Sequence, residues 1–218
     1  SLSSCGKRTA DMPQWMKAEP ERYFHLIDKN GRPADSPSPF ATASMEADVR
    51  AFTAFMRRLK AFDPQRTVIM VQVQNEPGTW GPVRDYGPAA QKAFEAPVPA
   101  NVLKAMNAPS SGSSPNWQTA FGVEAEVNFH AWAVATYIEK VAAAGKAVYP
   151  LPLYANAALR DPLKPGAPGS YESGGPTDNV IPIYKVAAPS LDVVCPDIYI
   201  SDPVAYLKVL ELYHLDDN

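Results

Sequence analysis

The residue pair Asn75-Glu76, followed by a Pro-Gly turn, has the composition of a site for acid–base chemistry. A carboxylic acid can protonate a leaving oxygen and later activate water, and an adjacent amide can hydrogen-bond a sugar hydroxyl. An Asn-Glu pair arises by chance in roughly every second chain of this length, so its position matters more than its presence. Here it follows the β-rich run 67–74 and precedes a long loop with Trp80. We therefore expect Glu76 to be catalytic and Asn75 to bind substrate.

Two further predicted strands deliver polar and aromatic residues at their ends. The carboxyl ends of parallel strands share one rim, where α/β enzymes place their reactive groups. A sugar needs hydrogen-bond partners for its hydroxyls and an aromatic ring for its apolar face. The additional predicted substrate-binding residues are Trp80, Asn156, Asp197 and Tyr199. Structural roles are the alternatives: an ion pair for the aspartate, a core-edge position for the tyrosine, and packing or turn formation for the others.

Alternating helices and strands must position these residues. Strands are predicted over Thr67–Gln74, Ala147–Tyr154 and Leu191–Ile200. The apolar start of the first strand is typical of a parallel strand covered on both faces. Helices are predicted over 44–62, 89–94, 101–106, 120–144, 180–188 and 203–213, with Gly145 as the C-cap of the fourth. The alternation indicates an α/β fold with a parallel sheet.

The amino-terminal part of the chain differs from the rest. Residues 1–43 lack sustained periodicity and are rich in proline, so we expect a loop segment with one helical turn around 13–18. Residues 44–218 carry the helix–strand units. The loops 77–118 and 161–178 are long and rich in Pro and Gly, and connections of such length are usually functional.

Composition and charge exclude several classes of function. The 218 residues carry a net charge of −3 without a basic block, which argues against nucleic acid or an anionic membrane surface as partner. No apolar run approaches the roughly 20 residues of a membrane span. The three histidines lie far apart without ligand spacing, and no glycine pattern of a dinucleotide or phosphate site is present. We expect neither a metal nor a cofactor. Cys5 and Cys195 define no disulfide framework.

Several segments together resemble the bacterial β-galactosidase-like enzymes of glycoside hydrolase family 35. The segments are VIMVQVQNEPG, KAFEAPVPANVLKAM, VAAAGKAVYPLPLYANAAL, YESGGPTDNVIPIYK and DVVCPDIYISD. They span most of the chain. The motif of that family commonly reads Glu-Asn-Glu, whereas this chain has Gln74 at the first position. The departure removes a negative charge beside Glu76, which would alter the pKa of that group or a sugar contact.

The resemblance implies a fold, a reaction and a role for each candidate. It implies a partial (β/α)8, or TIM, barrel covering about strands four to six, with residues 1–218 as one partial catalytic domain. It implies retaining hydrolysis of terminal β-galactosides, with Glu76 as acid/base, Asn75 on the sugar 2-hydroxyl and Tyr199 near a catalytic carboxylate. The nucleophilic Glu would follow Asn218, so we expect these residues alone to be inactive.

Other possibilities stay open beside this one. One is a non-catalytic carbohydrate-binding or degenerate form, and another is a β-glucanase or mannanase of the same clan. Asp197 and Glu172 are the candidates for an unsuspected second carboxylate within the chain. The resemblance favours a periplasmic or extracellular location. The sequence leaves the exact sugar and the oligomeric state open.

Overall fold

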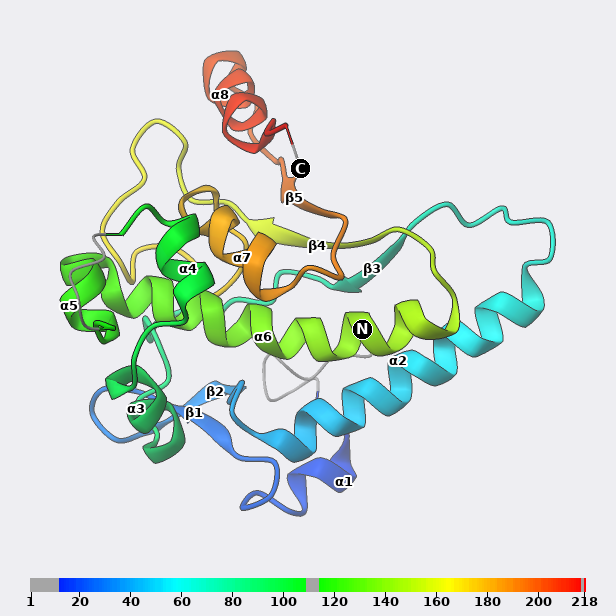
Figure 1. Ribbon diagram of the computed structural model, residues 1–218, viewed down its shortest axis with the longest axis horizontal. Coiled ribbons are helices and arrows are strands. Elements are labelled where there is room, and N and C mark those ends of the chain that lie inside the picture. The colour runs from blue at the N-terminus through cyan, green and yellow to red at the C-terminus, as the bar shows by residue number, and fades with distance from the viewer. Residues whose placement is uncertain (1–11, 109–113, 217) are drawn as a thin grey trace.

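A three-stranded parallel sheet with flanking helices forms the centre of the molecule (Figure 1). The computed structural model describes residues 12–108, 114–216 and 218. In chain order the elements are α1 (Gln14–Lys17), β1 (His25–Ile27), β2 (Pro33–Pro37), α2 (Thr42–Phe62), β3 (Val71–Gln74), α3 (Pro88–Glu95), α4 (Ala100–Ala105), α5 (Trp117–Phe121), α6 (Ala125–Val148), β4 (Leu153–Ala158), α7 (Ile181–Ala187), β5 (Val193–Asp197) and α8 (Pro203–Tyr213). Single 3-10 turns precede α6 and α7.

The sheet has the order β3-β4-β5, and both neighbouring pairs are parallel. Each pair is joined through helices, as parallel strands require. Because the strands are sequential and such crossovers are right-handed, the connecting helices lie on one face. The predicted α/β class with a parallel sheet is therefore confirmed, and within the described residues the sheet is open rather than closed into a barrel.

The two faces of this sheet differ in chemistry. Val71, Val73 and Leu153 belong to the main hydrophobic core, which the helices complete. The opposite face carries Gln72 and Asn156, whose side chains hydrogen-bond to each other across the strands. The expectation that the first strand is covered on both faces is therefore wrong for the described residues, because alternate residues of β3 point to a polar face and Met70, just before it, is 40% exposed.

Helix α6 is the central element of the core and lies beside α2 (Figure 1). It continues through Val148, so the predicted end at Gly145 is wrong. Gly145 permits close helix packing: an added Cβ would lie 2.2 Å from Cε1 of Phe52 on α2. The glycine therefore serves the contact between two helices, a role that local sequence cannot distinguish from a cap.

The strands are shorter than predicted, and one is displaced. The predicted strand Ala147–Tyr154 is wrong at its start, because α6 extends to Val148 and two prolines delay β4 until Leu153. Since β4 begins there, its neighbour pairs only from Val71 onward, leaving Ile69 80% exposed. Helices α3, α4 and α8 match their predicted ranges within one residue.

The segment before α2 contains a hairpin that the periodicity did not reveal. The strands β1 and β2 pair antiparallel within the range expected to be a loop, and the predicted helical turn is present as α1. Asp85 ties this hairpin to the loop after β3, since its Oδ1 accepts hydrogen bonds from the backbone nitrogens of Ile27 (3.1 Å) and Gly87 (2.7 Å). The hairpin thereby supports the loop that follows Glu76.

Candidate active site at the carboxyl rim of the sheet

The carboxyl ends of β3, β4 and β5 bring four of the predicted site residues together. Asn75 and Glu76 follow β3 directly, Asn156 lies within β4, and Asp197 is the last residue of β5. The parallel register places Asn156 beside Cys195 and Ala158 beside Asp197. The four residues are joined in one hydrogen-bond network.

Asn156 is the centre of this network. Its Oδ1 accepts hydrogen bonds from the backbone nitrogen of Glu76 at 2.9 Å and from Nε2 of Gln72 at 2.6 Å. Its Nδ2 donates to Oδ1 of Asn75 at 3.0 Å and to Oδ2 of Asp197 at 2.6 Å. One side chain on the middle strand thus connects the ends of all three strands.

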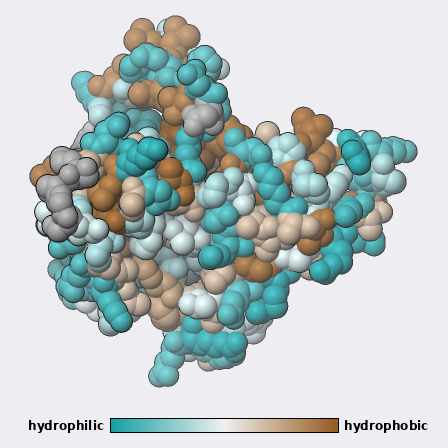
Figure 2. Space-filling view, viewed as in Figure 1, coloured by the Kyte–Doolittle hydropathy of each residue, from teal (hydrophilic) through white to brown (hydrophobic). Residues whose placement is uncertain are grey.

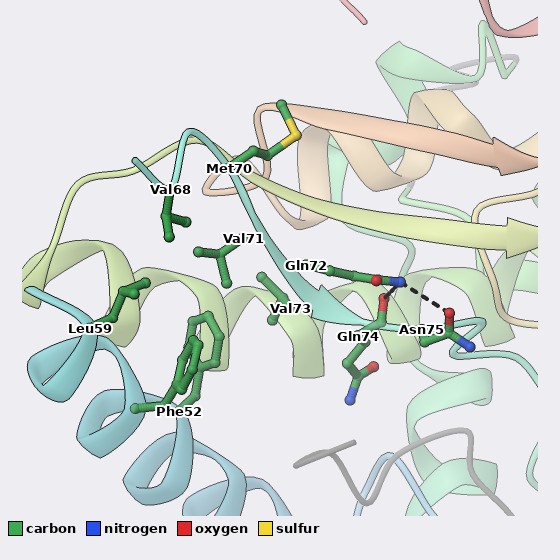
Figure 3. Close-up of a pocket in the computed structure, with 10 residues that line it drawn as sticks. Phe52, Leu59, Val68, Met70, Val71, Gln72, Val73, Gln74 and Asn75 are labelled. Carbon is green, nitrogen blue, oxygen red and sulfur yellow. Dashed lines mark hydrogen bonds between the residues drawn. The ribbon is translucent and has the colours of Figure 1, made fainter. Parts of the chain in front are cut away.

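Gln72 belongs to the network and was not among the predicted site residues. Its Nε2 lies 3.1 Å from Oδ1 of Asn75, and Figure 3 shows this bond beside the apolar side chains of β3. Because Oδ1 of Asn75 accepts from both Gln72 and Asn156, its Nδ2 is the group left to donate to a ligand. The available signal was the alternation of valine and glutamine over Val71–Gln74, which is typical of a strand with one polar face.

The backbone of Glu76 has an unusual conformation. Its φ of 46° lies in the left-handed region, which non-glycine residues rarely adopt. Pro77 follows it, and a residue before proline is further restricted towards extended conformations. Strain of this kind concentrates at functional sites, where surrounding contacts hold it in place.

Glu172, from the loop after β4, packs closely against the turn after Glu76. It is 3% exposed, and a Cβ added at Gly78 would lie 2.3 Å from its Cγ. An antiparallel bridge between Thr79 and Ser173 joins the same two loops. The glycine is therefore required by close packing against a buried acid, which fixes the turn that carries the candidate acid/base.

A pocket of about 400 Å³ opens at this rim. Its lining includes three carboxylates, of Glu76, Asp161 and Asp197, with the aromatic residue Tyr199. Arg160 also lines it and forms a bidentate ion pair with Asp178, which raises the pKa of the guanidinium above its ordinary value although burial opposes this shift. The pocket therefore combines acids, a neutralised cation and an aromatic surface.

The two aromatic candidates are both exposed. Tyr199 follows β5 and is 89% exposed, and Trp80 lies on the loop after β3 and is 64% exposed. Within the described residues, the hydrogen-bond network around Asn156 extends to neither ring. Each ring is accessible to a ligand, and its predicted role in binding stays a prediction.

Cys195 lies on β5 beside these groups. It is a free thiol, and burial together with the charge of Asp197 raises its pKa. A raised pKa keeps the sulfur protonated and weakly nucleophilic at neutral pH. Cys5 lies outside the described residues.

Other kinds of site find no support in the described part of the chain. No three His, Cys, Asp or Glu side chains in residues 12–108, 114–216 and 218 converge where a metal ion would fit. In the same ranges, no helix combines the length and apolar character needed to cross a membrane.

Comparisons with known proteins add no assignment. No model of a protein family matches the sequence, and a search of curated proteins gives no match.

Proposed function

We propose that this chain is part of a retaining glycoside hydrolase that acts on terminal β-galactosides or related β-linked oligosaccharides. The observation that carries the proposal is the pocket at the carboxyl rim. It places Glu76 and Asp197 together, beside the exposed ring of Tyr199. Paired acids with an aromatic surface suit the hydrolysis of a glycosidic bond. The choice of β-galactosides comes from the resemblance to glycoside hydrolase family 35.

Each residue has a role in the proposed reaction. The Glu76 carboxyl protonates the glycosidic oxygen as the bond to the anomeric carbon breaks, and its carboxylate then removes a proton from the water that releases the sugar. The Nδ2 of Asn75 donates to the sugar 2-hydroxyl, a contact that strengthens in the transition state. Asp197 accepts from further hydroxyls, while Tyr199 and Trp80 offer surfaces for sugar rings.

The proposal includes a larger fold, with β3, β4 and β5 as strands four to six of a (β/α)8 barrel. The helices on one face and the polar residues on the other agree with an outer and an inner barrel surface. The outer edge of β5 is also informative. The Asn218 amide bonds the backbone nitrogen (2.9 Å) and oxygen (3.0 Å) of Val194, as a neighbouring strand would.

The proposed nucleophile is a Glu on a further strand beside β5, after Asn218. Retaining enzymes place their two carboxyl groups about 5–5.5 Å apart, so this Glu would face Glu76 across the pocket. A periplasmic or extracellular location is part of the same proposal and rests on the resemblance.

The acid/base assignment is tested on the whole natural protein with aryl β-galactosides. Glu76→Gln should lower kcat/KM for phenyl β-galactoside by about 10²–10⁴-fold, because a poor leaving group needs a proton. The loss should be far smaller for dinitrophenyl β-galactoside. With Glu76→Ala, added azide should restore turnover and yield β-galactosyl azide. Normal hydrolysis of the phenyl substrate by Glu76→Gln would overturn the assignment.

A non-catalytic carbohydrate-binding protein is the second candidate. The exposed rings of Trp80 and Tyr199 favour it, since aromatic surfaces bind sugars without any chemistry. In that case the protein would bind galactosides in an NMR titration and would leave aryl galactosides intact. A β-glucanase or mannanase of the same clan would instead be distinguished by the sugar that raises the melting temperature.

A further inference from the structure

The amide of Asn156 has no hydrogen-bonding capacity left for a substrate. An asparagine side chain offers two acceptor lone pairs and two N–H donors. All four are used by protein groups: Gln72 and the Glu76 backbone on the oxygen, Asn75 and Asp197 on the nitrogen. The side chain is 4% exposed, so a sugar hydroxyl would have to displace one of these bonds. This geometry favours a role in support of the site over direct substrate binding.

Two of these bonds reach Glu76 and Asp197, two of the three carboxylate residues that line the pocket. The bond to the Glu76 nitrogen holds a backbone at φ 46°, a conformation that is sterically unfavourable for a non-glycine residue. The other bond holds Oδ2 of Asp197 at 2.6 Å from Nδ2 of Asn156. Because Asn156 lies on a strand of the sheet, it offers a rigid reference for both.

We propose that Asn156 is a positioning residue that sets the placement of Glu76 and Asp197 relative to each other. Its oxygen holds the left-handed turn that directs Glu76 into the pocket, and its nitrogen orients the Asp197 carboxylate. A neutral amide performs both tasks without adding charge to a pocket that already holds several acids. This role rests on the proposed function, in which Glu76 is the acid/base.

The kinetic test is Asn156→Ala in the whole natural protein, with the two aryl β-galactosides used for Glu76. A misplaced acid should lower kcat/KM for phenyl β-galactoside by about 10²-fold and for dinitrophenyl β-galactoside by less than about tenfold, because only the former needs protonation. Asn101→Ala is the matched control, since Asn101 donates to the backbone oxygen of Val186 on another helix. It should change neither substrate's kinetics.

A second measurement reads the hydrogen bond directly. In NMR spectra the Glu76 amide should shift and exchange faster with solvent in Asn156→Ala. Both effects should be absent in Asn101→Ala, which leaves the Asn156 side chain in place. An unchanged Glu76 amide in Asn156→Ala, or an equal loss of activity on both substrates, would overturn the positioning role.

The outcomes also separate this role from the proposed function. If Glu76→Gln shows no dependence on the leaving group, the acid/base assignment fails, whatever Asn156 does. If Glu76→Gln shows that dependence and Asn156→Ala does not, only the positioning role fails.

Discussion

The left-handed backbone of Glu76 lowers the stability of the fold at a residue that we propose to be catalytic. Replacement by glycine removes the steric cost of a positive φ, offset in part by the greater flexibility of glycine in the unfolded chain. We expect Glu76→Gly to raise the free energy of unfolding by about 0.5–1 kcal/mol relative to Glu76→Ala. Both variants lack the carboxyl group, so the difference between their free energies of unfolding in urea measures the effect of the backbone conformation alone. Equal stability of the two variants would show that the positive φ of residue 76 causes no strain.

His130 gives stability a pH dependence. It is buried on α6 with Nε2 3.2 Å from Oγ1 of Thr79, and burial, helped by the charge of Arg84, lowers its pKa to about 3. Because the unfolded histidine takes up a proton near pH 6.5 and the folded one does not, the free energy of unfolding should fall as the pH drops from about 6.5 to 3. The slope contributed by this group is up to about 1.4 kcal/mol per pH unit.

Urea unfolding across that pH range tests this dependence. His130→Gln should flatten the curve between pH 6.5 and 4, since glutamine does not titrate. His214→Gln is the control, because His214 is exposed. If the His130 variant keeps the same pH dependence as the unmodified protein, another group is responsible.

The loop between β4 and α7 is held by side chains from several elements. Hydroxyls of Tyr184 and Tyr213 donate to the backbone oxygens of Gly174 and Pro176, at 2.7 and 3.0 Å. The bidentate Arg160–Asp178 pair, with both distances 2.6 Å, ties the start of the loop to its end. The loop contributes Arg160 to the pocket, so its fixation shapes the rim.

Loss of this ion pair should release the loop. Asp178→Asn leaves the Arg160 guanidinium without its partner charge in a largely buried position, which should cost about 2 kcal/mol. It should also make the loop a site of limited proteolysis. Glu211→Gln breaks the exposed Lys208–Glu211 pair and should cost less than about 0.5 kcal/mol. Equal stability of the two variants would show that the Arg160–Asp178 ion pair does not stabilise the fold.

At the scale of the whole molecule, apolar surface is exposed near both edges of the sheet, beside β3 and beyond β5. Helix α8 presents Val204, Leu207 and Leu210, each at least 42% exposed, and Figure 2 shows hydrophobic surface over this part of the molecule. Near β3, an apolar pocket of about 420 Å³ lies between the strand and α2 (Figure 3). Surfaces of this kind usually contact another element or chain.

We therefore expect the 218-residue chain by itself to self-associate. Light scattering at increasing concentration should show an average mass above that of a monomer. Leu207→Lys should reduce the association with little change in melting temperature, because that side chain is 63% exposed. Lys104→Leu, which adds apolar surface on α4, should not reduce it. A soluble monomer with a sharp two-state melt would contradict the prediction.

The sequence by itself determined the order of the main helices and strands and the parallel sheet, because hydrophobic periodicity and Pro or Gly boundaries are local signals. It also selected Asn75, Glu76, Asn156 and Asp197, since polar residues at strand ends meet at one rim. The hairpin before α2 was not predicted because both of its strands are short and β2 begins and ends with proline.

Only the tertiary structure decided how those residues are used. The role of Gly145 depends on Phe52 of another helix, and the length of β3 depends on where its partner begins. The bonds of Asn156 join residues up to 84 positions apart. The left-handed backbone of Glu76 is held by a hydrogen bond from its nitrogen to Asn156 on the neighbouring strand. These contacts form only when β3 and β4 pair in the sheet, and that pairing joins segments that lie far apart in the sequence.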